Sequence, residues 1–358
     1  MFQFAERRSE TGLASGVRAI GFTLVEVLIV VTIIVILISI LVPTLSGTRT
    51  AARSASTRSI MTDIGTAVQL FKAEKDRQPG PYTPDQMGHP DNLTRGVTQM
   101  ENAIVDLMGG RVPTGSPDPD GVLIKLTVIG NDPTQVVMVN PNLIGAPDGP
   151  GYLSIGRNVL SPVQGQYHGG NPQGRVDQMP DILDPFGSPV VLWTRNMVAG
   201  RNPEFSMVQA PTNRGLAIRR GWYYWAGNAG YLRSSSLGVN RVNQSRLSVL
   251  GRPVVDGLDL GYPIPSDTDL QISLGALLGH PNLSRPRAGD DFGGLQEPTA
   301  PLSDVVLHSA GPDGVYLGNE ALRLRERAHL RAVYQREGQI PERSLPIDRF
   351  DDLIVPAG

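Results

Sequence analysis

The stretch that decides the fold is GFTLVEVLIVVTIIVILISILVPTL, from Gly21 to Leu45. Between Phe22 and Val42 it carries a single ionisable residue, Glu26. About 20 apolar residues in a helix span the hydrocarbon core of a bilayer, and a helix satisfies its own backbone there. The stretch therefore predicts a transmembrane helix over residues 22–43. Arginines flank it on both sides, so charge alone leaves its orientation open: Arg7, Arg8 and Arg18, then Arg49, Arg53 and Arg58.

Three interpretations of this stretch compete. A cleaved secretory signal has a shorter apolar core and a small-residue cleavage site, and neither is present here. A plain membrane anchor accounts for the length and the basic leader but not for Glu26, because a carboxylate in lipid is costly unless it is paired or protonated. From so near the end of the helix it could also reach the interface by snorkelling. In the third interpretation, the acid has a function of its own.

The residues G-F-T-L-V-E, which begin at Gly21, resemble the N-terminal motif of type IV pilins and type II secretion pseudopilins. The resemblance implies that residues 1–21 are a leader, that prepilin peptidase cuts after Gly21 on the cytoplasmic face, and that Phe22 is then N-methylated. It also implies that Glu26 pairs with the freed amine of a neighbouring subunit and sets the register of packed helices. Attraction between opposite charges in a low-dielectric bundle supports that role. The leader is long for a pseudopilin.

A helical pattern continues beyond the membrane segment, over residues 44–76. Apolar residues recur there at spacings of three and four, which predicts one buried helix face, and the breaker Gln78–Pro81 ends the pattern. One helix of about 50 residues, kinked or loosened near Pro43 and Gly47, and two separate helices both fit the pattern. The resembling family commonly has a proline at the position of Pro43. The apolar face consists of Ile60, Ile64, Ala67, Val68 and Phe71.

Residues 77–358 form the predicted globular domain. The chain has 41 glycines and 30 prolines in 358 residues, which predicts a loop-rich domain with short strands. It has no cysteine, so disulfides, thiolate metal sites and a cysteine nucleophile are excluded. The net charge of −2 gives no indication of nucleic acid binding. Strands are predicted at Val122–Val128 and Val136–Val139, and a short helix at Ile104–Met108.

Two further segments stand out. The segment DPFGSPVVLW, residues 184–193, predicts a tight turn followed by a strand. It resembles the D-P-W-G-x-P turn of the major pseudopilin of type II secretion, with Phe186 in place of tryptophan. The aromatic run Trp222–Trp225 predicts a strand covered on both faces, and a ligand or partner surface is the alternative.

The segment DVVLHSAGPDG, residues 304–314, resembles the last strand of pseudopilins and the S-x-G-x-D-G loop that folds around calcium in that family. Carboxylates and carbonyls on a flexible glycine loop suit calcium. The alternative is that Asp313 lies in a turn and that the later acids are solvated. Residues 319–338, predicted to be helical, intervene where the family has a short loop. The resemblance implies carboxylate ligands Asp313, Asp351 and Asp352, with carbonyls near Leu307, Gly311 and Val315.

No common catalytic motif is present, and none of the five histidines shows metal-pair spacing, so we expect a protein that is not an enzyme. The expected fold is α+β, with a long N-terminal helix packed on a small antiparallel sheet and Gly/Pro-rich loops. The resemblance implies a subunit of a type II secretion pseudopilus in the inner membrane, with a periplasmic C-terminal domain. Its implied partners are prepilin peptidase, sister pseudopilins and inner-membrane components of the secretion system. The alternative is a membrane-tethered domain that binds calcium or polysaccharide without polymerising.

Overall fold

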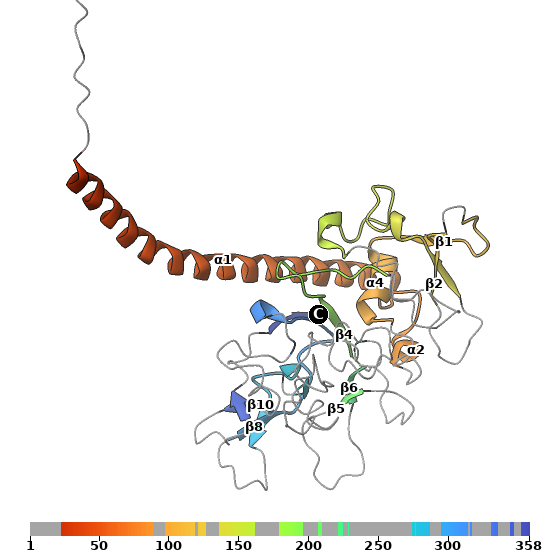
Figure 1. Cartoon of the computed structure of the whole chain (residues 1–358). Helices are drawn as coiled ribbons and strands as arrows, with labels where there is room; N and C mark the ends of the chain where they lie inside the picture. Colours follow the sequence, from red (N-terminus) through yellow and green to blue (C-terminus); the bar gives the residue numbers. More distant parts are fainter. Residues whose placement is uncertain are drawn as a thin grey trace, which may run out of the picture. The chain divides into compact units, whose positions relative to one another are not determined.

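Figure 1 shows a computed structural model of the whole chain, which divides into two compact units, Met1–Thr50 and Ala51–Gly358. The division falls inside the first helix. The structure describes residues 23–88, 97–118, 121–126, 136–161, 179–195, 207–209, 221–224, 228, 274–275, 277–286, 295–313, 316, 331–335, 344–346 and 352–358.

Helix α1 runs from Leu24 to Lys75 and has 52 residues. It passes through Pro43 and Gly47 as one helix, so the alternative of two separate helices is wrong. It ends at Asp76, whose φ of 52° lies in the left-handed region that stops an α-helix. The helix therefore ends a few residues before the predicted breaker at Gln78–Pro81. The helical pattern predicted over residues 44–76 is confirmed.

Among the described residues, the short helices α2 (Pro84–Gly88) and α4 (Gln99–Leu107) follow in the second unit. Helix α4 begins at a capping box, in which the hydroxyl of Thr98 accepts from the Glu101 backbone N–H and the Glu101 carboxylate accepts from the Thr98 N–H. This exchange satisfies two backbone donors that a helix start leaves unpaired. The short helix predicted at Ile104–Met108 is confirmed, but it begins earlier, at the residue after Thr98.

The central sheet is antiparallel and has the strand order β12-β9-β4. Its members are β4 (Val191–Thr194), β9 (Val305–Ser309) and β12 (Leu353–Ala357). Strand β9 lies between the other two, with Leu307 opposite Leu192 on one side and opposite Val355 on the other. All residues of β4 and β9 are buried, as expected for strands covered on both faces. The strand predicted after the DPFG turn is confirmed.

A second antiparallel sheet has the order β1-β3-β2, from β1 (Arg111–Val112), β2 (Ile124–Leu126) and β3 (Val137–Val139). Strand β3 confirms the strand predicted at Val136–Val139, and β2 confirms the middle of the one predicted at Val122–Val128, whose last two residues lie outside the described residues. Short 3-10 helices of the described residues lie at Pro141–Leu143 (η1), at Arg157–Val159 (η2) and, after β9, at Gly311–Asp313 (η5).

Strands β5 (Met207–Gln209) and β6 (Gly221–Tyr224) form an antiparallel pair. Trp222, Tyr223 and Tyr224 of β6 are buried, which confirms the predicted covered strand for these three residues, while Trp225 lies outside the described residues. The last sheet has the order β11-β10-β8-β7, from β7 (Ser284–Pro286), β8 (Leu295–Pro298), β10 (Arg331–Gln335) and β11 (Ser344–Pro346). Its β10–β11 pair is parallel, unlike the other pairs among the described strands.

Strand β10 corrects the helix predicted over residues 319–338, because its residues are extended and pair with both β8 and β11. Val333 and Tyr334, inside the predicted helix, belong to this strand. β-branched and aromatic residues favour strands once neighbouring strands are available for pairing. The rest of that prediction lies outside the described residues.

The core of the second unit joins one face of α1 to α4 and to the two three-stranded sheets. From α1 it takes Met61, Ile64, Val68 and Phe71, each at most 3% exposed. Close packing is possible because position 65 is glycine: a Cβ there would stand 2.9 Å from the Cβ of Ala357 on β12. The mixed helix and strand content of the expected fold is thus confirmed.

Candidate functional site

The first turn of α1 holds the residue singled out by the sequence. The Glu26 carboxylate accepts from both the backbone N–H and the hydroxyl of Thr23 through Oε2, each at 2.8 Å, and the Thr23 hydroxyl accepts from the Glu26 N–H at 3.2 Å. This reciprocal arrangement is a capping box. It aims the Glu26 carboxylate back along the chain, toward the N-terminal side of the helix. Gly21 and Phe22, the predicted cleavage and methylation residues, lie outside the described residues.

Residues Leu24–Leu41 of α1 are long and apolar enough to cross a membrane, and no part of this segment is buried in the structure. Its other polar side chains are satisfied within the helix: the Thr32 hydroxyl donates to the Leu28 carbonyl at 2.8 Å, and the Ser39 hydroxyl to the Ile36 carbonyl at 2.7 Å. Glu26 is the only ionisable residue of this segment.

The residues of the predicted calcium loop are only partly described. Leu307 lies in the middle of β9, Gly311 opens η5 with a φ of +70°, and Asp313 ends η5. Val315 and Asp351 lie outside the described residues, as does the side chain of Asp313. Within the part of the chain that the structure describes, no group of three or more acidic or histidine side chains could hold a metal. Calcium binding stays a prediction.

Asp352, the remaining predicted ligand, has a well-defined contact. Its Oδ1 lies 2.7 Å from Nε2 of His308, and both side chains are 0% exposed. On the other side of the imidazole, Trp193 Nε1 donates to His308 Nδ1 at 3.4 Å, and the Tyr316 ring packs edge-on at 5.1 Å. The indole bond requires an unprotonated Nδ1, so His308 donates to Asp352 from Nε2. Asp352 therefore uses one oxygen to hold a buried histidine.

The turn at residues 184–188 is organised by Asp184. Its Oδ1 accepts from the backbone N–H groups of Phe186 and Ser188, both at 2.9 Å, and its Oδ2 accepts from the Ser309 hydroxyl at 2.5 Å. Burial raises the pKa of the Asp184 carboxyl above its ordinary value, while these three donors partly offset that effect. Asp184 thus ties the turn to the end of β9. Ser309 and His308 consequently bind different carboxylates.

A buried polar cluster that the sequence does not reveal links α4 to β4 and β6. Gln99 donates through Nε2 to the Tyr224 carbonyl and accepts through Oε1 from the Thr194 N–H, both at 2.6 Å. Asn228 accepts from the Gln99 N–H and donates to the Leu192 carbonyl. Gln99 and Asn228 are 129 residues apart, and no local pattern indicates such a pair.

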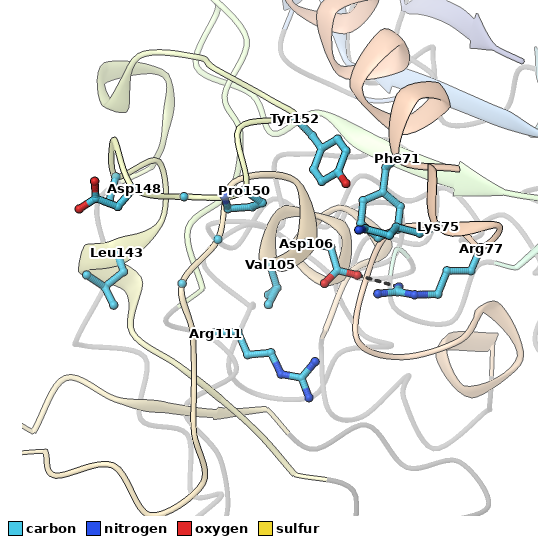
Figure 2. Close-up of a pocket in the computed structure, with 14 residues that line it drawn as sticks. Phe71, Lys75, Arg77, Val105, Asp106, Arg111, Leu143, Asp148, Pro150 and Tyr152 are labelled. Atoms are coloured by element: carbon cyan, nitrogen blue, oxygen red, sulfur yellow. Dashed lines mark hydrogen bonds and ion pairs between the residues drawn. The ribbon is translucent and has the colours of Figure 1, made fainter. Parts of the chain in front are cut away.

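A cleft of about 650 Å³ opens where α1 ends, and Figure 2 shows the side chains around it. Arg77 Nη1 donates to Asp106 Oδ2 at 2.7 Å, and its guanidinium lies over the Phe71 ring at 4.8 Å from the centroid. The Tyr152 ring meets Phe71 edge-on at 5.1 Å. Arg111, the first residue of β1, lines the same cleft. No local sequence pattern indicates this site, because its residues come from segments that are distant in the chain.

No protein-family model, no curated protein and no solved structure matches this chain.

Proposed function

We propose that this chain is a structural subunit of a pilus-like filament, resembling a type II secretion pseudopilin, and that it assembles through the first part of α1. The observation that carries the proposal is an exposed apolar helix of 18 residues, Leu24–Leu41, with one carboxylate in its first turn. At about 1.5 Å per residue this length approaches the thickness of a bilayer core. The segment would anchor the subunit in the inner membrane, with the second unit on the periplasmic side.

The position of Glu26 supports assembly rather than simple anchoring. Its Oε2 already accepts from Thr23, which lies next to Phe22, the residue that would become the new terminus. If neighbouring helices pack with a small axial shift, the freed amine of one subunit would lie at the same position along the bundle axis as the Glu26 carboxylate of the next. In a low-dielectric bundle such a pair offsets part of the cost of burying each charge. Prepilin peptidase would supply the amine by cleaving after Gly21.

The continuity of α1 supports the second half of the proposal. The same helix that carries the apolar segment also contributes Met61, Ile64 and Val68 to the core of the second unit. A filament subunit needs such a connection, because the packed helices must carry their folded domains with them. A domain that is only tethered to the membrane does not need this continuity, because two helices joined by a loop would tether it equally well.

The decisive experiment compares Glu26→Leu with the full-length wild type in cells that contain the filament machinery. We expect the variant to insert in the membrane and to be cleaved to a chain that starts at methylated Phe22, but to be absent from cross-linked filaments. Asp63→Leu is the matched control, because Asp63 is an exposed acid on the same helix outside the apolar segment. Intact mass and cross-linking give the two readouts.

Normal incorporation of Glu26→Leu into filaments would show that the chain is a tethered domain instead. A wild-type chain that keeps its leader would be equally damaging, because the terminal amine proposed to neutralise Glu26 would then not be formed.

A further inference from the structure

We infer that the cleft at the end of α1 is a docking site for a protein segment that presents a carboxylate side chain. The inference concerns the second unit alone and does not depend on filament assembly. Figure 2 shows the residues that carry it: Arg77, Asp106 and Arg111, with Phe71 and Tyr152 on the adjoining wall.

The first step concerns Arg77, which is held in place by a single nitrogen. Its Nη1 donates to the Asp106 carboxylate and to the carbonyls of Gly80 and Gln78, at 2.7, 2.9 and 3.1 Å. The face of its guanidinium rests on Phe71. Arginine has five N–H donors, and within the described residues Nε and Nη2 have no protein acceptor. The Arg77 guanidinium is therefore already oriented, and its Nε and Nη2 hydrogens are available to donate to a ligand.

The second step concerns the charges around it. Asp106 Oδ2 is shared between Arg77 and the Gly80 N–H, at 2.7 Å each, and the side chain is only 12% exposed. Lys75 is paired with its neighbour Glu74 at 2.7 Å. Arg111 is exposed, and the described part of the chain offers it no ion pair. Asp148 also lines the cleft as an exposed carboxylate, and in Figure 2 its side chain points away from both arginines. The cleft therefore keeps unused guanidinium N–H donors on Arg77 and Arg111, and such donors favour planar oxyanions that can accept two parallel hydrogen bonds.

The third step distinguishes a carboxylate from a phosphate. Phosphate sites commonly use the N-terminal ends of helices, where backbone N–H groups and the helix dipole attract negative charge. This cleft is bordered by two C-terminal ends instead, that of α1 at Lys75 and that of α4 at Leu107. Their partial negative charge disfavours a dianion more than a monoanion. A single carboxylate is the better match.

The fourth step concerns the rest of the ligand. The cleft is open to solvent and has apolar walls, including Leu143, which is 44% exposed. Small-molecule sites usually enclose most of their ligand, whereas an open cleft with apolar and basic walls suits a side chain presented by a larger partner. The fitting partner is a protein segment in which a glutamate or aspartate lies beside an apolar residue.

The test uses the full-length protein in detergent micelles and a fluorescein-labelled decapeptide of alternating glutamate and leucine, measured by fluorescence anisotropy. A second decapeptide carries glutamine in place of every glutamate. We expect the wild type to prefer the glutamate peptide, and Arg111→Gln to weaken that binding by about tenfold, the effect of one charged hydrogen-bonded contact. Lys125→Gln, which removes an exposed cation of β2 outside the cleft, should leave it unchanged.

Leu143→Glu provides a second variant, because an added carboxylate on the cleft wall should compete for Arg111 and reduce binding without removing a core residue. Equal affinity for the two peptides, or equal loss in the Arg111 and Lys125 variants, would overturn the inference. Displacement of the peptide by inorganic phosphate more effectively than by acetate at the same ionic strength would also overturn it, since the site would then be a phosphate site.

Discussion

At the scale of single residues, Asp304 is the carboxylate that ties the end of α1 to the start of β9. It accepts from Lys72 Nζ and from Arg195 Nη1, both at 3.1 Å. The bond from Lys72, and then that from Arg195, hold the pKa of Asp304 below its ordinary value. Its stabilising contribution is therefore complete above about pH 4 and is lost as the pH falls through the lowered pKa of the folded protein.

We accordingly expect Asp304→Asn to lower the free energy of unfolding by roughly 0.5–1 kcal/mol at neutral pH, a value typical of partly exposed ion pairs. The difference from wild type should shrink below about pH 4 as the wild-type carboxyl becomes protonated. Urea unfolding at several pH values measures this. Asp63→Asn, an exposed acid on α1, serves as the control. A difference that grows as the pH falls would contradict the assignment.

The predicted calcium site can be tested at the same scale. If the loop after β9 binds calcium, added Ca²⁺ should raise the melting temperature of the wild type, and Asp313→Ala should abolish the rise. Asp352→Asn separates two roles, because Asp352 also holds His308. If Asp352 serves only the histidine, this variant should be less stable but keep its calcium response. An unchanged melting temperature of the wild type with Ca²⁺ would exclude the site.

Single residues also show the limit of reading a sequence. Glu26 was identifiable because a lone acid in an apolar run is conspicuous without any partner. Asp184 was identifiable as part of a turn, but not as the acceptor for Ser309, 125 residues away. Gln99, Arg77 and Arg111 gave no signal, because their roles depend on neighbours that only the folded chain brings together.

At the scale of elements, the packing of α1 on β12 depends on the glycine at position 65. A Cβ there would meet the Ala357 Cβ at 2.9 Å, a distance that requires one of the two elements to move. We expect Gly65→Ala to destabilise the protein by about 1–3 kcal/mol, as overpacking does in a tight core. Alanine is the better helix former, so helix propensity alone predicts the opposite sign.

Gly47→Ala is the matched control on the same helix, since a Cβ at that position would have nothing within 4 Å. It should be neutral or stabilise α1 by up to about 1 kcal/mol. Thermal unfolding of both variants measures the contrast. Equal effects of the two substitutions would show that Gly65 is not a close contact between α1 and β12.

Elements with strong periodicity were predicted well. α1, β2, β3, β4 and β6 follow from apolar repeats bounded by turn residues. The failure at β10 has a physical cause: Arg331–Gln335 carries residues that suit either a helix or a strand, and pairing with β8 and β11 decides between them. Such long-range pairing leaves no local trace in a sequence.

At the scale of the whole molecule, the described residues that form the core of the second unit lie beyond the apolar segment, from Met61 onward. We therefore expect a chain that starts at Ala51 to remain in solution without detergent and to unfold in one cooperative transition. Its melting temperature should lie within a few degrees of that of the full-length protein in micelles. Circular dichroism and size-exclusion chromatography measure both properties. Aggregation, or a broad non-cooperative melt, would show that the apolar segment contributes to the core.

The contrast in composition between the apolar run at residues 22–43 and the rest of the chain was visible in the sequence. The strand orders could not be predicted from the sequence. Strand β12 comes from the last residues of the chain and pairs with β9, although β10 and β11 lie between them in the sequence. Their register depends on which apolar faces meet, and short strands in a loop-rich domain constrain that choice only weakly.

The continuity of α1 has a mechanical consequence. No loop intervenes between the apolar segment and the buried residues of α1 between Met61 and Phe71. Tension applied along this helix therefore meets no flexible segment that could extend. A force strong enough to displace the helix must stretch its own hydrogen bonds or pull apolar side chains out of the packed interior. A pull on the apolar segment would therefore act directly on the residues that α1 contributes to the core of the second unit.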